Sequence, residues 1–389
     1  MTIEPSRLRQ SIFFLFILSL GYVVYSVDRS ILSSVLSVIE VELRLSKPQV
    51  GYLGAAQYIG VLAVVFFAGY ISDILGRKKI IFAGVSIFTS FSWMIGIAPD
   101  FFWVFLFRLV SGIGEGLFWP VAMAAVAERF AGKKGFSLGI FYVGFDIGSV
   151  AGVTAGALSF TTFGSWRYAF LLPPLAGIFV ILGLLFTQDK GIEKNRIQPL
   201  ILKVVRKKEV YLIMVFAFLA TWSSVWLVVF LPYYFYKVMH FGVLSSALLS
   251  SFVLASGGTG KIVMGRLSDK LEREKVLLVS SFLVVLSYLM FFFTTSFEIS
   301  FAGALMMGFF SSSVFPVMQA LATEYASEMP GASLGLTTSS QSVATVLSPI
   351  MSGYLFLLGV GKALALDAII PSAIMNFVAI LLIVLRHRG

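Results

Sequence analysis

The chain alternates between long apolar runs and short polar connections from one end to the other. Runs of ~20 apolar residues are long enough to cross the ~30 Å hydrocarbon layer of a bilayer as α-helices. These runs are apolar on every side, whereas the strands of a membrane barrel alternate apolar and polar residues. The pattern therefore predicts an all-α membrane protein with twelve transmembrane helices. The predicted spans are residues 11–36, 50–71, 80–98, 101–126, 136–160, 166–186, 210–236, 244–264, 276–294, 299–322, 334–358 and 364–385.

The composition agrees with this class and limits the chemistry that the protein can perform. Of the 389 residues, 58% are hydrophobic and only 12% are charged, whereas soluble domains have about 25% charged residues. Cysteine is absent, which removes disulfides and thiolate chemistry, and the two histidines, His240 and His387, lie outside the predicted spans. We therefore expect no metal, no cofactor and no enzymatic activity. Because no G-x-x-x-x-G-K-[ST] loop occurs, ATP is not the expected source of energy.

The net charge of +10 follows from where the basic residues lie. Of the 29 Lys and Arg residues, 21 lie at the two ends of the chain and in the even-numbered connections, and five lie in the odd-numbered ones. Connections rich in Lys and Arg stay on the cytoplasmic side of a membrane. We therefore expect a multi-pass protein of the cell membrane, with both termini cytoplasmic and with lipid, not nucleic acid, around it. The N-terminus lacks the features of a cleaved signal peptide, so the first span is expected to be retained.

An internal repeat divides the chain into two pseudo-symmetric halves. The longest polar connection, residues 188–209, is a predicted cytoplasmic linker between six-helix bundles at 1–187 and 210–389. An offset of 196 residues aligns GYISDILGRKK, which begins at Gly69, with GRLSDKLEREK, which begins at Gly265. The same offset pairs Gly112 with Gly308, Pro120 with Pro316, Glu128 with Glu324, Gly135 with Gly331 and Gly139 with Gly335. Two halves of like orientation predict a binding site near the middle of the bilayer, between the bundles.

The stretch 69–79 resembles the signature of the connection between the second and third helices in the major facilitator superfamily. We call its residues the gate motif; they are Gly69, Asp73, Gly76 and Arg77, with Asp269 and Arg273 in a degenerate second copy. The resemblance extends over the whole chain through the twelve-span plan, and it implies alternating access by rocking of the two halves. It also implies that Asp73 caps and pairs across the cytoplasmic helix ends while Arg77 anchors the connection. Charge topology by itself would account for Arg77 but not for the fixed spacing of Asp73 and the glycines.

Five charged residues lie in the interior of the predicted spans of the N-terminal half, away from the span ends: Asp28, Arg29, Arg108, Glu115 and Asp146. The positions 196 residues further on carry no charge, so we interpret the intramembrane charge as confined to one half. Each such group costs about 3 kcal/mol or more, which indicates a function. At ~1.5 Å per residue, Asp28 and Arg108 both fall in the outer half of the membrane. Arg108 and Glu115 are two turns apart and therefore share a helix face.

This placement predicts a cluster that binds an anion and a proton. Arg29 and Arg108 are expected to attract the substrate anion, because a guanidinium fork fits a carboxylate or phosphate and keeps its charge. Asp28 and Glu115 are expected to carry the coupling proton, since desolvation and a nearby arginine act on a carboxylate in opposite directions. The alternative is that Asp28 with Arg29, and Arg108 with Glu115, form self-satisfied ion pairs that lock two helices together.

The same residues add to the resemblance. VDRS in the first span and RLVSGIGEG in the fourth resemble the anion:cation symporter branch of the superfamily, which includes sialin-like proteins. Spinster-type lipid transporters have a similar pattern. The resemblance implies proton-coupled symport of a small organic anion, with a proton-coupled efflux antiporter or a lysolipid transporter as the alternative. By matching position, it places the anion and proton roles on Asp28, Arg29, Arg108 and Glu115. A monomer is expected.

Other polar and aromatic residues within spans are candidates with simpler alternatives. Asp146 lies beside a stripe of glycines, residues 144, 148, 152 and 156, that is typical of close helix packing, and it is a third candidate for proton coupling. Candidates for substrate binding are Gln57 in the second span, Trp222 and Trp226 in the seventh, Gln319 in the tenth and Gln341 in the eleventh. The alternatives are aromatic packing for the tryptophans and hydrogen bonds between helices for the amides.

Overall fold

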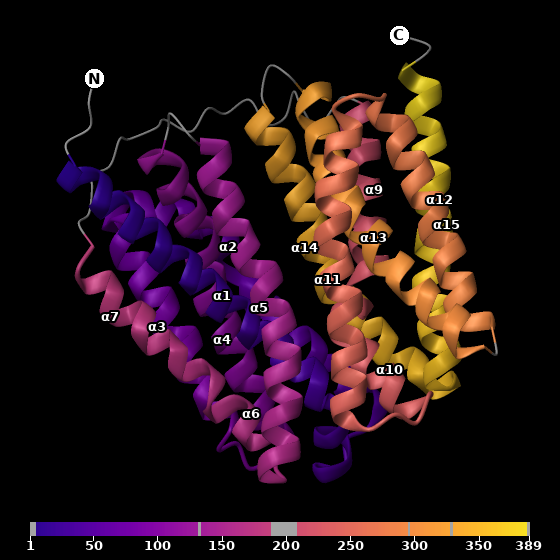
Figure 1. Cartoon of the computed structure of the whole chain (residues 1–389), viewed down its shortest axis with the longest axis horizontal. Helices are drawn as coiled ribbons and strands as arrows, with labels where there is room; N and C mark the ends of the chain where they lie inside the picture. The colour runs from indigo at the N-terminus through magenta and orange to yellow at the C-terminus, as the bar shows by residue number, and fades with distance from the viewer. Residues whose placement is uncertain (1–4, 131–133, 188–207, 295, 327–329, 387–389) are drawn as a thin grey trace. The chain divides into compact units, whose positions relative to one another are not determined.

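The computed structural model describes residues 5–130, 134–187, 208–294, 296–326 and 330–386, and these form helices joined by short connections (Figure 1). Twelve helical segments in these ranges are long and apolar enough to cross a membrane. The prediction of an all-α protein with twelve spans is therefore confirmed. Most of the predicted linker, residues 188–207, lies outside the described residues.

The helices follow one another along the chain in a fixed order, from α1 near the N-terminus to α15 near the C-terminus. They are α1 (Pro5–Glu42), α2 (Lys47–Leu75), α3 (Arg77–Ile95), α4 (Phe101–Arg129), α5 (Lys134–Phe163), α6 (Arg167–Leu171), η2 (Pro173–Leu175), α7 (Ala176–Leu185), α9 (Lys208–Val229), α10 (Leu231–Lys237), α11 (Val243–Ser268), α12 (Arg273–Phe293), α13 (Phe297–Tyr325), α14 (Pro330–Leu355), η3 (Phe356–Leu358) and α15 (Val360–Arg386).

Two predicted spans are interrupted where prolines occur. The span predicted at 166–186 consists of α6, the 3₁₀ turn η2 at Pro173 and Pro174, and α7. The span predicted at 210–236 ends as α9 at Val229, and Pro232 stands in the first turn of α10. Proline lacks a backbone N–H and fits the first turn of a helix better than its interior. The hydropathy therefore predicts both spans, but it does not predict that each of them is interrupted.

Packing divides the chain into two compact units. The N-terminal unit comprises Met1–Asn195 and Phe241–Ser251, and the C-terminal unit comprises Arg196–His240 and Phe252–Gly389. The start of α11 thus groups with the N-terminal unit, which differs from a division at the predicted linker. The assignment of two six-helix bundles stays a prediction.

Close approach of helix backbones organises the N-terminal unit. On α5, a Cβ atom added at Gly144 or Gly152 would lie within 2.8 Å of a backbone oxygen of α1. A Cβ at Gly148 would likewise meet the carbonyl of Val23. The glycine stripe therefore is the α1–α5 contact, and its predicted packing role is confirmed. Ser26 of α1 donates to the carbonyl of Phe145 at 2.7 Å and lies 2.7 Å from the hydroxyl of Ser149, which joins the same two helices through polar groups.

The C-terminal unit repeats contacts of the N-terminal unit at the offset of 196. A Cβ at Gly112 of α4 would meet the carbonyl of Gln57 on α2, and one at Gly308 of α13 would meet the carbonyl of Val253 on α11. Where Gly60 faces the carbonyl of Leu109, the equivalent Ser256 donates a hydrogen bond to the carbonyl of Leu305 at 2.9 Å. The repeat inferred from sequence is therefore also a repeat of three-dimensional contacts.

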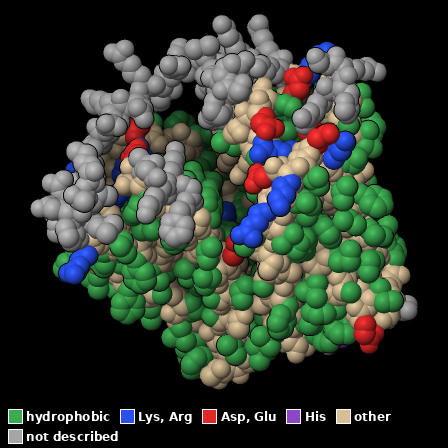
Figure 2. Space-filling model, turned by 45° about the horizontal axis from the view of Figure 1, so that its top comes forward, with side chains coloured by type: hydrophobic (Ala, Val, Ile, Leu, Met, Phe, Trp, Pro, Cys, Tyr) green, Lys and Arg blue, Asp and Glu red, His purple; other side chains and the backbone are tan. Residues whose placement is uncertain are grey.

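The outer surface is apolar over much of its area. On the face drawn in Figure 2, hydrophobic side chains make up much of the described surface and charged side chains are few. Large side chains such as Phe66, Phe179 and Phe252 are more than half exposed. Such a surface is unfavourable in water and suits the hydrocarbon of a bilayer.

Candidate functional site

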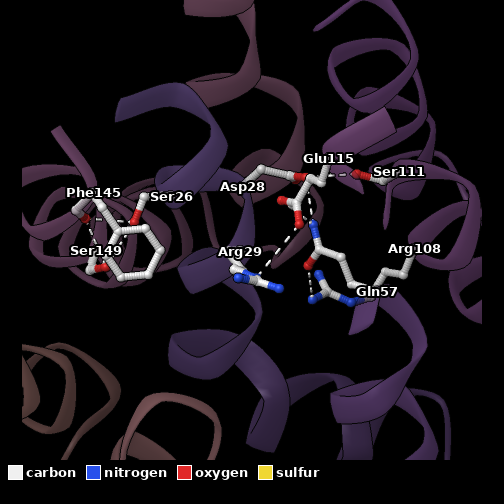
Figure 3. Close-up of polar contacts among 9 residues, drawn as sticks. All are labelled: Ser26, Asp28, Arg29, Gln57, Arg108, Ser111, Glu115, Phe145 and Ser149. Carbon is white, nitrogen blue, oxygen red and sulfur yellow. Dashed lines mark hydrogen bonds and ion pairs between the residues drawn. The ribbon is translucent and has the colours of Figure 1, made fainter. Parts of the chain in front are cut away.

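A buried polar network in the N-terminal unit joins three helices through one amide, Gln57 (Figure 3). The Nε2 atom of Gln57 donates to Asp28 Oδ2 and to Glu115 Oε1, both at 2.8 Å. Its Oε1 atom accepts from Arg108 Nη2 at 2.5 Å. Ser111 Oγ donates to the same Asp28 oxygen at 2.7 Å. Asp28, Gln57, Arg108 and Glu115 are each no more than 2% exposed, so these four side chains lie out of contact with solvent or lipid.

The position of Gln57 follows from the α2–α4 contact. Gly112 has no side chain, and a Cβ there would collide with the backbone of Gln57. Gly112 lies four residues after Arg108 and three before Glu115, so all three positions share one face of α4. The close approach therefore inserts the Gln57 amide between a cation and an anion that are two helical turns apart.

Arg29 completes the network and is its most accessible member. Its Nε atom lies 3.6 Å from Glu115 Oε2, a loose ion pair, and its side chain is 17% exposed. The guanidinium lies over the ring of Tyr58 at 4.4 Å and over that of Tyr25 at 5.2 Å. A cation–π contact uses the flat face of the guanidinium. It therefore holds an arginine in place and leaves the N–H donors at the edge of the guanidinium available for hydrogen bonds. Among the described residues, no hydrogen bond reaches either terminal nitrogen of Arg29.

Several polar atoms of the network have no hydrogen-bond partner among the described residues. They are Asp28 Oδ1, Arg29 Nε, Arg108 Nε, Arg108 Nη1 and Glu115 Oε2. A buried polar atom without a partner costs about 1–3 kcal/mol, and more when charged. The two arginines and two carboxylates balance in formal charge, yet they keep unused donors and acceptors. These atoms can therefore donate hydrogen bonds to, or accept them from, a further polar group.

The structure corrects the pairing considered from sequence. Arg108 and Glu115 do share a face, but Gln57 bridges them. Arg29 pairs with Glu115 of another helix and not with its neighbour Asp28. The predicted cluster of four charges is present, and the described contacts within it run between helices. Asp146 lies half-buried on α5, outside the contacts that define this network.

The gate motif forms the same ion-pair arrangement in both units. Arg77 pairs with Asp73 at 3.4 Å and with Glu128 at 2.5 Å. At the offset of 196, Arg273 pairs with Asp269 at 3.5 Å and with Glu324. The predicted pairing of Asp73 is thus made with Arg77, one turn away.

The two glycines of the gate motif differ in their structural role. Gly76 ends α2 with φ of 98°, a backbone conformation that residues with a side chain rarely adopt. In the second copy the equivalent residue is Glu272, whose φ is −60°. A Cβ at Gly69 would meet nothing within 4 Å. Only Gly76 is therefore required by the backbone seen here.

The C-terminal candidates are not brought together as one group. Trp226 is buried against the rings of Tyr288 and Phe292, at 5.9 and 5.5 Å, which is the packing alternative. Trp222 is half-buried and donates through Nε1 to Asp367 Oδ1 at 2.8 Å. Gln319 is exposed and Gln341 is half-buried.

Asp367 corrects the inference that intramembrane charge is confined to one half. It lies in α15, inside the span predicted at 364–385, and is 4% exposed. The signal was present as an Asp in an apolar run. It was missed because only the equivalents of the N-terminal charges were compared, and Asp367 is equivalent to Leu171.

Comparison with known proteins places the chain among membrane transporters. The Major Facilitator Superfamily matches residues 18–294 and 246–389. The chain is 23% identical over 356 residues to the 3-(3-hydroxy-phenyl)propionate transporter of Escherichia coli, covering 88% of this chain and 86% of that one. It is 27% identical over 183 residues to protein spinster homolog 1 of Xenopus tropicalis, covering 44% and 34% respectively.

A solved structure extends the comparison to the fold. The inward-facing, occupied form of a bacterial homolog of the human lysosomal transporter Spinster matches with a TM-score of 0.77 at 18% identity. The match covers 98% of this chain and 96% of that one.

Proposed function

The chain belongs to the Major Facilitator Superfamily, a family of transporters and not of enzymes, and we propose that this member carries a small organic anion together with protons by alternating access. In this proposal the halves at residues 1–187 and 210–389 rock around a central site. The protein would work as a monomer in the cell membrane, with both termini in the cytoplasm, as the distribution of Lys and Arg favours.

The observation that carries the proposal is the charge-balanced network with unused donors on two arginines. Among the described residues, no hydrogen bond reaches the terminal nitrogens of Arg29, which is partly exposed, and Nε and Nη1 of Arg108 have no partner. A carboxylate binds such planar donors through two parallel, charge-assisted hydrogen bonds. A neutral solute could accept from these donors but would lack the negative charge that strengthens the bonds, and a cation would be repelled by the arginines. The network therefore favours an anion, and a carboxylate above all.

Proton coupling follows from the loose pair between Arg29 and Glu115. A substrate carboxylate that binds Arg29 brings a second negative charge to the guanidinium that neutralises Glu115 Oε2, and this oxygen has no other partner among the described residues. Leaving a buried charge unpaired costs about 3–5 kcal/mol. Protonation of Glu115 removes that charge, so binding of an anion and binding of a proton support each other. The net charge of the site then stays constant, and this mutual dependence of the two binding events is what symport requires.

The relatives bear on substrate class and leave a second candidate. A transporter named for hydroxyphenylpropionate, a carboxylic acid, matches nearly the whole chain. The sequence match to protein spinster homolog 1 covers 44% of the chain, whereas the bacterial Spinster homolog matches the fold over 98% of it. A lysolipid, or efflux by antiport, is the second candidate, because the charged pattern of the first and fourth spans also resembles that of Spinster-type lipid transporters. A lysolipid phosphate would use the same two arginines, so the substrate must be decided by transport.

The test uses purified protein in liposomes and a panel of aromatic acids, sugar acids, phosphorylated compounds and lysolipids. We expect an inward proton gradient to drive accumulation of carboxylic acids. Arg29→Lys should lower uptake and exchange about 10- to 100-fold, because lysine cannot form the planar double contact. Glu115→Gln should retain exchange of substrate and lose uptake against a gradient.

A matched control separates coupling from general damage. Glu40 is also a buried carboxylate in an ion pair, with Lys47 at 2.5 Å, but lies outside the network. Glu40→Gln should leave proton-driven uptake intact. Normal uphill uptake by Glu115→Gln would refute the coupling role, and accumulation that survives collapse of the proton gradient would refute symport with protons.

A further inference from the structure

The C-terminal unit contains a buried carboxylate that the proposed mechanism does not use. Asp367 is 4% exposed and lies where α9, α14 and α15 meet. Its Oδ1 accepts from Trp222 Nε1 at 2.8 Å, and its Oδ2 is hydrogen-bonded to Ser352 Oγ. A carboxylate in such surroundings requires either a cation or a proton to balance it.

No cation balances Asp367 among the described residues. No Lys or Arg in the described ranges forms an ion pair with it. On α15 itself, Lys362 is five residues earlier and therefore about 140° around the helix. The charged residue of α10, Lys237, lies near the rings of Tyr233 and Tyr236.

The other groups that contact Asp367 in the described part of the chain hold no counter-charge either. The titratable group that interacts with it from α12 is Tyr288, whose hydroxyl donates to the carbonyl of Ser223 at 2.5 Å. From α9 and α14 the contacting groups are Trp222 and Ser352, which are neutral. The surroundings therefore supply hydrogen bonds but no positive charge.

We propose that Asp367 is a second proton-binding site, located in the C-terminal unit and separate from the Asp28–Glu115 network. Its role in coupling rests on the proposed function, whereas its proton binding does not. The ligand is a proton and not Na⁺, because the indole N–H directed at Oδ1 repels a metal ion and, among the described residues, only the Ser352 oxygen is hydrogen-bonded to the carboxylate. Sodium ordinarily needs several oxygen ligands, as other hard cations do.

The hydrogen bonds also indicate which oxygen takes the proton. An indole N–H can only donate, so Trp222 requires Oδ1 to remain an acceptor in both states. A serine hydroxyl can donate or accept. When the proton binds Oδ2, Ser352 turns from donor to acceptor and the contact is kept. Binding therefore converts the carboxylate to a carboxylic acid without disturbing Trp222, and release restores the anion.

Infrared difference spectroscopy of the full-length purified protein, without any transported solute, tests the site directly. A pH step from alkaline to acidic should produce a carboxylic-acid C=O band that is absent in Asp367→Asn and still present in Glu115→Gln. In a parallel dye measurement, Asp367→Asn should take up about one proton fewer than the unaltered protein. Ser352→Ala should shift the band, because the acid loses its acceptor.

Two outcomes would overturn the proposal. One is a difference spectrum and proton count for Asp367→Asn that equal those of the unaltered protein. The other is a band that responds to Na⁺ at constant pH. If Asp367→Asn does not fold, Asp367→Glu replaces it in the test. This variant keeps a carboxyl group, so its carboxylic-acid C=O band should still be present but at a shifted frequency. Loss of uphill uptake in Glu115→Gln tests the proposed function separately, since Glu115 takes no part in the Asp367 signal.

Discussion

Replacing Gln57 with leucine tests the inference that one amide holds the charged network together. Leucine is close to glutamine in size, so the change removes hydrogen bonds with little change in packing. The bonds lost are those to Asp28, Glu115 and Arg108, at 2.8, 2.8 and 2.5 Å, and all three partners are charged. Asp28 retains the bond from Ser111, whereas Glu115 retains only its loose pair with Arg29.

The expected loss of stability follows from these three bonds. Hydrogen bonds between membrane helices average about 0.6 kcal/mol, which gives about 2 kcal/mol for three. Hydrogen bonds to charged groups contribute at least about 1.5 kcal/mol in soluble proteins, which gives about 5 kcal/mol. We therefore expect Gln57→Leu to lower the free energy of unfolding by about 2–5 kcal/mol.

The assay is SDS titration of the purified protein in mixed micelles, followed by circular dichroism. Gln319→Leu makes the same chemical change at an exposed amide, and it should change the free energy of unfolding little. Equal unfolding midpoints for Gln57→Leu and Gln319→Leu would show that the amide does not organise the network. The double variant Gln57→Leu with Glu115→Gln should lose less than the sum of the single losses, because the two share one bond.

Three further predictions concern the helix contacts and the gate motif, all measured as free energies of unfolding in the same way. Gly112→Ala should destabilise the protein by about 1–3 kcal/mol, because the added Cβ collides with the α2 backbone. Gly139→Ala is the control: the added Cβ meets nothing within 4 Å, so this variant should be neutral or stabilised by up to about 1 kcal/mol. Equal effects of the two substitutions would refute the contact. Gly76→Ala should cost about 1–3 kcal/mol because φ there is 98°, and an unchanged stability would contradict the strain. A double-mutant cycle on Arg77 and Glu128 should give a coupling of no more than about 1 kcal/mol, since Glu128 is half exposed; a coupling several times larger would indicate a buried gate pair.

The fold was predictable because membrane spans depend on local composition. A run of ~20 apolar residues becomes a helix in a bilayer whatever its neighbours are, since each backbone group must be hydrogen-bonded within the segment. The repeat was also readable, because Asp73 with Arg77 and Asp269 with Arg273 recur at one offset. Prolines at 173, 174 and 232 marked the interruptions, which were overlooked when hydropathy alone was counted.

The site was predictable in membership but not in its contacts. Charges inside spans identified Asp28, Arg29, Arg108 and Glu115 as one cluster, since such groups are costly outside an interior. Gln57 was only one of several amides with an ambiguous role. Its central position depends on how closely α2 and α4 approach, which a single helix does not encode.

The sequence by itself determined the twelve spans, the internal repeat and the buried charge, because each depends on side-chain chemistry along one segment or on the comparison of two segments. The tertiary structure alone decided which charges meet. Arg29 faces Glu115 and Gln57 bridges to Arg108 because glycines let particular backbones touch. It also revealed that Asp367 is anchored by Trp222 and Ser352, residues far from it in sequence. Pairing energies fall steeply with distance, so partners are set by the packing of whole helices and not by their order along the chain.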